Sequence, residues 1–239
     1  TDMHTKRGDT HRMAQMVKRV REARASAAAN ETVLLLSGGD DHTGSIFDEL
    51  LGWTEADYVV DAGYRAASAA GVDIAVLGNH EFDRGAAQLR LGIERDAAFP
   101  VLSANVADSA HLARDRDYVP AAIIEANRLR VGVIGLTTNI DIRTGTKADP
   151  AMRVASPVEA ATNLYRAVEA VSDVVVVLSH CGYGKGMHKS GKAGSLREIG
   201  EGDFAIAEAI GPLATKPVVL VGGHSHTELN TDGIDPNNM

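Results

Sequence analysis

The sequence predicts an α/β fold in which a sheet carries helices on its faces. Segments with a helical spacing of apolar residues alternate with short runs of Val, Ile, Leu and Ala along the 239 residues, which is the pattern of this fold class. The runs that end at Leu36, Leu77, Leu178 and Val221 are continuously apolar, so we expect strands that are covered on both faces. Asp, Asn or His follows each of these runs within a few residues.

The expected helices rest on apolar residues spaced three and four apart and on capping residues at the helix ends. Ser156-Pro157-Val158-Glu159 has the layout of a capping box with Pro at the first helical position, so a helix to Val171 is well supported. Gly71 is expected to cap the C-terminus of an earlier helix. The expected helices cover residues 13–28, 54–70, 85–95, 157–171 and 203–210.

The expected strands are short runs rich in β-branched residues that break at Gly, Ser or Asn. Two of them, 118–125 and 129–136, should pair through the turn Glu125-Ala126-Asn127-Arg128. The segment from Gly182 to Gly202 is rich in Gly, Lys and Ser and has no apolar period, so we expect a mobile surface loop there. The expected strands cover residues 32–36, 73–77, 100–103, 118–125, 129–136, 173–178 and 218–221.

The composition is that of a globular protein, with 44% hydrophobic and 23% charged residues. The formal net charge of −8 argues against a nucleic-acid polymer as the partner and against adhesion to anionic membranes. No run approaches the roughly 20 apolar residues of a membrane span. The single cysteine, Cys181, excludes an internal disulfide, and we expect it to be a small buried apolar residue. No pattern indicates an oligomeric state.

Side chains that bind metals gather where the strands end. Most of the nine histidines lie in these junctions, which is not expected for scattered surface histidines. Imidazole nitrogen mixed with carboxylate and amide oxygen suits divalent cations such as Zn²⁺, Mn²⁺ or Fe²⁺, and the near absence of cysteine argues against a purely structural zinc site. Seven potential ligands are too many for one tetrahedral ion and fit two. They are Asp2, His4, Asp40, Asn79, His180, His224 and His226.

A pair of metal ions predicts a class of reaction. Two divalent ions about 3.5–4 Å apart clamp the attacking and leaving oxygens of a phosphoryl displacement. The glycines at 38, 39, 78, 222 and 223 let the backbone turn tightly, so that the ligands come close to the ions. Hydrolysis of a phosphate ester is therefore the favoured reaction.

The motifs resemble those of the calcineurin-like metallophosphoesterases, and within them the 5′-nucleotidase group, which also contains UDP-sugar hydrolases and 2′,3′-cyclic-nucleotide phosphodiesterases. The segment from Phe99 to Asn105 also resembles the nucleotidase branch. The resemblance implies a four-layer α/β/β/α sandwich with two mixed sheets flanked by helices. The matching pieces, in family order, are Asp2-x-His4, Gly39-Asp40, Gly78-Asn79-His80-Glu81-Phe82-Asp83, Ser179-His180 and Gly223-His224-Ser225-His226.

The resemblance also implies a role for each ligand. Asp40 would bridge the two ions. The family usually has Gly directly after Asp-x-His, where this chain has Thr5, but no ligand is lost by this change. The first ion would be held by Asp2, His4 and His226, and the second by Asn79, His180 and His224.

His80 and Asp83 are implied to be the catalytic pair. His80 would contact the phosphate of the substrate, together with Asn79, and would stabilise the developing charge or protonate the leaving oxygen. Asp83 would orient His80 and fix its tautomer. Glu81 and Phe82, within the same motif, are interpreted as local structure.

Several other polar residues have plainer interpretations. His42 and Asp41 match no family ligand, so a position at the surface or behind the ligands is favoured. Asn105 follows a strand and could reach the site, but loop capping is supported at least as well. Surface positions are expected for His11, His111 and His188, and solvated side chains, which could also attract an anionic substrate, for Lys185, Lys189 and Lys192.

The resemblance implies a two-metal phosphoric ester hydrolase, most simply a 5′-nucleotidase-like phosphomonoesterase acting on nucleotides. The enzyme alternatives are a 2′,3′-cyclic-nucleotide phosphodiesterase and a UDP-sugar hydrolase. The alternative outside enzymes is a catalytically silent binding module on the same fold. Intact His80 and Asp83 favour the enzyme.

The two ends of the sequence suggest a longer protein. The chain begins at Thr1-Asp2-Met3-His4 with no signal peptide, and we expect residues to be missing before it. We expect a catalytic domain over 1–230, truncated at its N-terminal edge, and the start of a linker over 231–239 that leads to an absent C-terminal domain. The resemblance implies a periplasmic or extracellular location.

Overall fold

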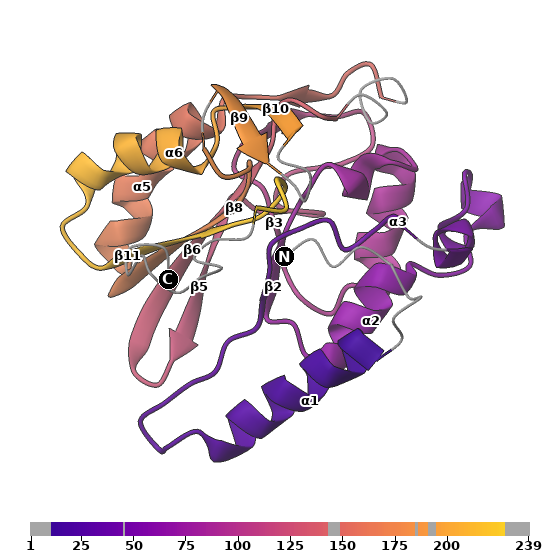
Figure 1. The fold of residues 1–239 in the computed structure, drawn as a ribbon. Helices are drawn as coiled ribbons and strands as arrows, with labels where there is room; N and C mark the ends of the chain where they lie inside the picture. Colours follow the sequence, from indigo (N-terminus) through magenta and orange to yellow (C-terminus); the bar gives the residue numbers. More distant parts are fainter. Residues whose placement is uncertain (1–10, 45, 143–148, 185, 191–194, 228–239) are drawn as a thin grey trace.

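Two β-sheets face each other between two sets of helices (Figure 1). The computed structural model describes residues 11–44, 46–142, 149–184, 186–190 and 195–227, and for 11–13, 186–190 and 195–198 it describes the backbone alone. One sheet has the strand order β1-β2-β3 and pairs only in parallel among these residues, whereas the other, β11-β8-β6-β5, is mixed because β5 runs antiparallel to β6.

The strands of the two main sheets are short, and two smaller sheets lie beside them. The smaller sheets pair β4 with β7 and β9 with β10, both antiparallel. The strands are β1 (Leu36–Ser37), β2 (Ile74–Val76), β3 (Val101–Leu102), β4 (Val106–Asp108), β5 (Ala121–Ala126), β6 (Leu129–Thr137), β7 (Arg153–Val154), β8 (Val174–His180), β9 (Gly186–Ser190), β10 (Ser195–Gly200) and β11 (Val218–Gly222).

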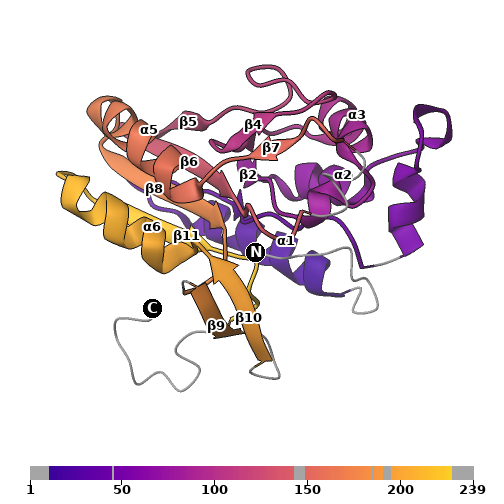
Figure 2. The ribbon, with the colours of Figure 1, turned by 90° about the horizontal axis from the view of Figure 1, so that it is seen from above.

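The helices cover the outer faces of the sheets. Seen from above, α5 and α6 lie outside the four-stranded sheet, and α2 and α3 lie on the opposite side of the molecule (Figure 2). None of the helices in the described part of the chain is long and apolar enough to cross a membrane. The helices are α1 (His11–Ser26), α2 (Ala62–Ala70), α3 (Ala86–Asp96), α5 (Pro157–Val171) and α6 (Asp203–Ile210), with 3₁₀ turns at Ile46–Leu51, Glu55–Asp57, His80–Phe82 and Gly211–Leu213.

Three apolar clusters separate the four layers. In β2, Ile74 and Val76 face the second sheet, whereas Ala75, and Leu77 directly after the strand, face α2 and α3. Successive side chains of a strand point to opposite faces, so a strand buried on both sides needs apolar residues at every position. The four-layer arrangement implied by the resemblance is confirmed, and it explains why the strand runs do not alternate.

The two sheets are in close contact at one glycine. A Cβ on Gly135 in β6 would overlap the side chain of Leu102 in β3, and both residues lie in the centre of the sandwich. Leu102 is fully buried in the cluster between the sheets. Gly135 therefore sets the distance between the sheets at this point.

Local signals predict two elements well. The capping residue Ser156 accepts a hydrogen bond from the Glu159 N–H through Oγ at 3.0 Å, and α5 begins at the next residue. Strands β5 and β6 form the expected hairpin, and the two turn residues Asn127 and Arg128 have φ of 47° and 73°. Positive φ at both positions is the geometry of a tight hairpin turn whose twist matches the strands.

Several elements differ from the sequence prediction. The strand expected over 32–36 is limited to Leu36–Ser37, and β4 and β7 were not expected. Two further differences have a clear physical reason. The helix expected over 54–70 begins only at Ala62, because Asp61 caps it by accepting the Tyr64 N–H at 2.9 Å, while Thr54 belongs to a separate 3₁₀ turn. The segment 182–202, expected to be a mobile loop, contains the β9–β10 hairpin. Backbone pairing does not require apolar side chains, so a polar hairpin gives no hydrophobic signal.

Asp96 at the end of α3 anchors the start of α2. Its carboxylate accepts hydrogen bonds from the Asp61 N–H at 2.7 Å, from the Arg65 guanidinium, with Nε at 2.7 Å, and from the Tyr58 hydroxyl. Burial alone would raise the pKa of Asp96, but these hydrogen bonds outweigh burial and hold the pKa below its usual value of about 3.9. The stabilisation is therefore present above that value and is lost as the pH falls through the lowered pKa.

We expect Asp96→Asn to lower the free energy of unfolding by about 1.5–3 kcal/mol near neutral pH, since hydrogen bonds to a charged group are lost. The difference from the wild type should shrink as the pH falls from about 4, the pKa of an unfolded Asp, through the lowered pKa of Asp96 in the folded protein. Urea unfolding at several pH values measures both effects, with the exposed Asp108→Asn as the control. A difference that stays constant into the acid range would contradict this account.

Candidate metal centre

Four of the predicted ligands meet at one edge of the sandwich. Asp40 follows β1 and Asn79 follows β2 in the first sheet, while His180 ends β8 and His224 follows β11 in the second. These strands are parallel to their neighbours, so their carboxyl ends collect at one edge, where α/β folds bind ligands. The site therefore spans the two sheets, with two side chains from each.

The distances bring these four side chains into one cluster. Asp40, His180 and His224 each offer a ligand atom, and these atoms lie within 4.8 Å of one another with all three residues buried. His180 Nε2 is 3.1 Å from Asp40 Oδ2, and His224 Nδ1 is 2.9 Å from Asn79 Oδ1. Each of these two contacts crosses from one sheet to the other.

The hydrogen bonds of the two histidines fit a metal site. His180 Nδ1 lies 2.6 Å from the Gly38 carbonyl, which only accepts, so Nδ1 carries the hydrogen and Nε2 faces Asp40. The amide oxygen of Asn79 likewise takes the hydrogen of His224 Nδ1. Metal-binding imidazoles usually donate their other N–H to an oxygen in this way. A neutral Nε2 and a carboxylate 3.1 Å apart require a cation or a proton between them.

Asp40 is ionised at neutral pH. Burial would raise the pKa of Asp40, but His180 and His80 outweigh burial and hold the pKa well below its usual range. A carboxylate must be deprotonated to bind a metal ion, so this environment favours coordination. The Asp40 Oδ1 atom also accepts the His80 N–H at 2.9 Å.

Three of the predicted ligands have an unusual backbone conformation. Asp40, His224 and His226 have φ of 55°, 78° and 50°, in the left-handed region that residues other than glycine rarely adopt. Such a residue costs of order 1–3 kcal/mol and persists only when its surroundings fix it. This strain is concentrated in the loops that carry the ligands.

Glu81 fixes the loop that carries Asp40. Its buried carboxylate accepts the backbone N–H groups of Asp40 at 3.0 Å, Asp41 at 2.7 Å and His42 at 3.3 Å, and also that of Gly78 at 2.6 Å. Burial raises the pKa of Glu81 to about 7. The interpretation of Glu81 as local structure is therefore wrong, because it joins two loops about forty positions apart. The buried N–H groups of a glycine-rich loop need hydrogen-bond acceptors. This need was the signal in the sequence that could have identified Glu81.

His80 and Asp83 form a hydrogen-bonded pair beside the cluster. His80 Nδ1 lies 2.6 Å from Asp83 Oδ2, and both side chains are 33% exposed, so a ligand can reach them. The hydrogen bond from Asp83 raises the pKa of His80. Burial would raise the pKa of Asp83, but His80 and Thr43 lower it. The predicted contact between the two side chains is present.

A buried ion pair lies behind Asp40. His42 Nε2 is 2.7 Å from Asp61 Oδ2, and the His42 ring packs on Tyr64 with a centroid distance of 4.6 Å. Burial would lower the pKa of His42, but Asp61 outweighs it and the pKa rises to about 10. Asp41 is also buried and accepts the Ser37 hydroxyl at 2.6 Å. Of the two positions expected for His42 and Asp41, the one behind the ligands is correct.

None of the other candidate residues in the described part of the chain belongs to this cluster. His226 is exposed and is not among the clustered ligands of the described chain, while Asp2 and His4 lie outside the described residues. Asn105 caps a loop, since its Nδ2 donates to the Thr137 carbonyl at 2.6 Å and its Oδ1 accepts the Thr137 N–H at 2.9 Å. Cys181 is buried, as expected, and burial raises the pKa of its thiol.

The β9–β10 hairpin begins beside the cluster. A Cβ on Gly182 would lie 3.3 Å from the His224 ring and 2.9 Å from Ile199, which is buried. The Tyr183 N–H donates to Ser225 Oγ at 2.9 Å, next to His224. The segment that leads into the hairpin therefore contacts the segment that carries this ligand, and Figure 1 shows where the two strands of the hairpin lie.

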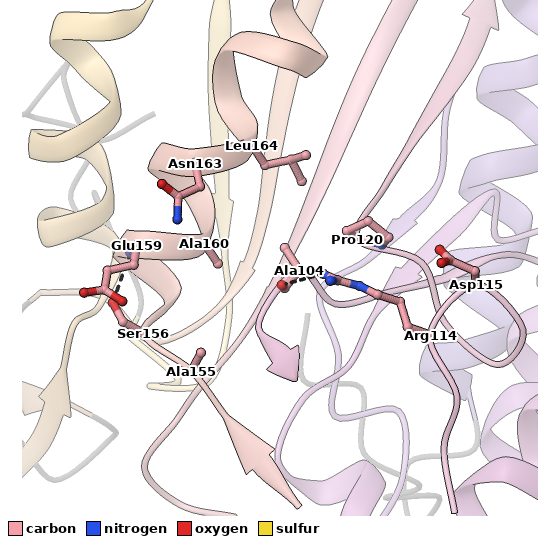
Figure 3. A pocket seen from close by; sticks show the side chains of 10 residues that line it. All are labelled: Ala104, Arg114, Asp115, Pro120, Ala155, Ser156, Glu159, Ala160, Asn163 and Leu164. Atoms are coloured by element: carbon pink, nitrogen blue, oxygen red, sulfur yellow. Dashed lines mark hydrogen bonds between the residues drawn. The ribbon is translucent and has the colours of Figure 1, made fainter. Parts of the chain in front are cut away.

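A separate cavity of about 490 Å³ lies between the start of α5 and the residues before β5 (Figure 3). Arg114 reaches across it and donates to the Ala104 carbonyl at 2.9 Å. Glu159 and Asn163 line it from α5, and no predicted site residue is among its lining residues. This cavity is distinct from the candidate metal centre.

Comparison with known sequences gives one family. A model of the calcineurin-like phosphoesterases matches residues 1–228. The chain is 33% identical over 205 residues to the protein UshA of Escherichia coli (strain K12), which covers 83% of this chain and 33% of that protein. It is 29% identical over 232 residues to a 5′-nucleotidase of Diplobatis ommata, and the match covers 96% of this chain and 35% of that protein. The chain spans about a third of the length of these curated relatives.

Solved structures give the same fold. The 5′-nucleotidase precursor from Thermus thermophilus aligns with a TM-score of 0.62 and 27% identity, over 90% of this chain and 36% of that one. The calcineurin-like phosphoesterase YfkN from Bacillus subtilis aligns with a TM-score of 0.64 over 91% of this chain and 64% of that one, and its 23% identity supports the fold alone.

Proposed function

Because the chain belongs to the calcineurin-like phosphoesterase family, we propose that it hydrolyses phosphoric esters at a two-metal centre. The observation that carries the proposal is the cluster of Asp40, His180 and His224 beside the His80–Asp83 pair. The cluster offers buried donors for cations, and the pair offers a proton donor that a substrate can reach.

We assign the ligands as the sequence predicts. Asp40 would help to hold both ions, and the mixed nitrogen and oxygen donors suit Zn²⁺, Mn²⁺ or Fe²⁺. When bound, such ions supply Lewis acidity and an activated water for attack on phosphorus. The second ion is assigned to Asn79, His180 and His224, and the first to Asp2, His4 and His226, of which only His226 lies among the described residues.

His80 acts on the substrate phosphate in this proposal. Its Nδ1 is held by Asp83, so its Nε2 is the atom that is directed to the substrate. The raised pKa of His80 favours the protonated ring, in which Nε2–H donates to a phosphate oxygen as charge develops there, or to the leaving oxygen. Asp83 keeps the ring in the orientation that this donation needs.

The proposed substrate is a nucleotide, hydrolysed as a 5′-phosphomonoester. The similarity to proteins named as 5′-nucleotidases supports this choice over a cyclic nucleotide or a UDP-sugar. The β9–β10 hairpin beside His224 is a candidate for contacts to the leaving group. We place the catalytic domain at 1–230 and assign the protein to the periplasm or the cell exterior on family resemblance.

Metal removal and a matched pair of variants test this proposal. We expect AMP and p-nitrophenyl phosphate to be hydrolysed by the metal-loaded protein, and exhaustive chelation to abolish the activity until metal is restored. Asn79→Ala should lose metal and activity, whereas Asn30→Ala, at an exposed position, should keep both. Elemental analysis gives the metal content of each. Robust hydrolysis by metal-free protein would overturn the proposal.

A further inference from the structure

The Asp83 carboxylate is held by a second residue besides His80. Its Oδ2 accepts a hydrogen bond from the Thr43 hydroxyl at 2.6 Å, and the same oxygen lies 2.6 Å from His80 Nδ1. Thr43 lies in the loop after β1, and Asp83 in the loop after β2. Asp83 is one-third exposed, so without Thr43 only the contact to His80 would compete with water for this oxygen.

Thr43 has a backbone conformation that does not suit its side chain. Its φ is 65°, in the left-handed region where a β-branched residue is disfavoured and where Gly or Asn would fit better. What Thr provides there and Gly does not is a hydroxyl, and this hydroxyl is the group that contacts Asp83. The strained position is therefore occupied by a residue whose side chain has a polar partner.

The surroundings hold Thr43 in this conformation. The residue before it, His42, is fixed on both sides, because Glu81 accepts its N–H at 3.3 Å and Asp61 pairs with its ring at 2.7 Å. Asp40, three positions before Thr43, is fixed by the same Glu81 carboxylate at 3.0 Å. One rigid loop thus presents a metal-ligand candidate and the Thr43 hydroxyl together.

We propose that Thr43 is a positioning residue for the His80–Asp83 pair, a role that rests on the proposed phosphoesterase function. The Thr43 hydroxyl fixes the Asp83 carboxylate, and Asp83 fixes the His80 ring through Nδ1. His80 Nε2 is thereby kept directed at the substrate. Because Asp40 belongs to the same loop, the distance between the metal site and the catalytic pair is set by one segment.

The variants Thr43→Ala and Thr43→Ser test this role, because neither is β-branched and they differ by one hydroxyl. We expect kcat of Thr43→Ala to fall about 5–30-fold with KM nearly unchanged, and Thr43→Ser to keep most of the wild-type kcat. In a His80→Ala background, Thr43→Ala should cause no further loss, since Thr43 acts through His80. Thr162→Ala, which removes a hydroxyl bonded to the Val158 carbonyl in α5, is the control.

A second measurement does not depend on activity. In metal-depleted protein we expect the ¹H and ¹⁵N signals of the His80 ring to shift or broaden in Thr43→Ala and to return to their wild-type positions in Thr43→Ser. If the wild type hydrolyses no phosphate ester, the proposed function fails and these spectra still decide the role of Thr43. Identical His80 spectra in the two variants, or loss of metal from Thr43→Ala alone, would overturn the proposal.

Discussion

Replacement of His80 by Ala is expected to lower kcat for phosphate ester hydrolysis by about 10²–10⁴-fold, the usual contribution of a positioned acid or base. The metal content should remain that of the wild type. His80 Nδ1 is hydrogen-bonded to Asp83 and its ring is one-third exposed, whereas the clustered donors are buried. The imidazole is therefore available to the substrate, while the cluster stays complete without it.

Activity measured together with elemental analysis separates this role from that of a ligand. His111→Ala is the matched control, because His111 is exposed and distant in sequence from every motif. Asp83→Asn should retain metal and lose part of the activity, since the amide keeps the size of the side chain but not its charge. Loss of metal from His80→Ala would show that His80 is a ligand, against the assignment made here.

Replacement of Glu81 by Ala is expected to destabilise the fold by about 4 kcal/mol or more, because buried polar groups lose their only charged acceptor. Four backbone N–H groups donate to this one carboxylate. For a chain of this length the melting temperature should fall by about 10 °C. Metal affinity should fall as well, since the loop that carries Asp40 is no longer held in its strained conformation.

Glu81→Gln provides the sharper comparison, because it keeps the volume but replaces one acceptor oxygen by a donor. We expect the melting temperature and the metal content of Glu81→Gln to lie between those of Glu81→Ala and those of the wild type. Glu94→Ala is the control, since Glu94 is exposed and forms only a surface pair with Arg90, worth about 0.5 kcal/mol. A Glu81→Gln protein with wild-type stability and metal content would contradict the role given to this carboxylate.

Elements with local signals were predictable. The cap at Ser156 and the turn at Asn127-Arg128 depend on neighbouring residues, and both form as expected. The start of α2 was not predictable from local signals, because its capping residue Asp61 is itself held by Asp96 at the end of another helix. The β9–β10 hairpin was missed because its strands are polar and leave no apolar pattern.

The residues of the candidate site also fall into those that local patterns predict and those that depend on distant partners. Residues that follow strand ends could be found, because parallel strands bring their carboxyl ends together, and Asp40, Asn79, His180 and His224 do meet. The roles of Glu81 and Thr43 depend on partners that lie about forty positions away and that only the fold brings close.

The close approach of the sheets at Gly135 has a consequence for how the protein can evolve. Asp40 and Asn79 follow strands of one sheet, whereas His180 and His224 lie at the ends of strands of the other. The distance between the sheets therefore also sets the distance between the two pairs of donors. A mutation in the central core that changes this distance should change the positions of the donors as well as the stability of the fold. Selection for catalysis therefore also acts on the packing of the interior. Fewer substitutions should be accepted at positions such as Leu102 than the apolar character of this residue alone suggests.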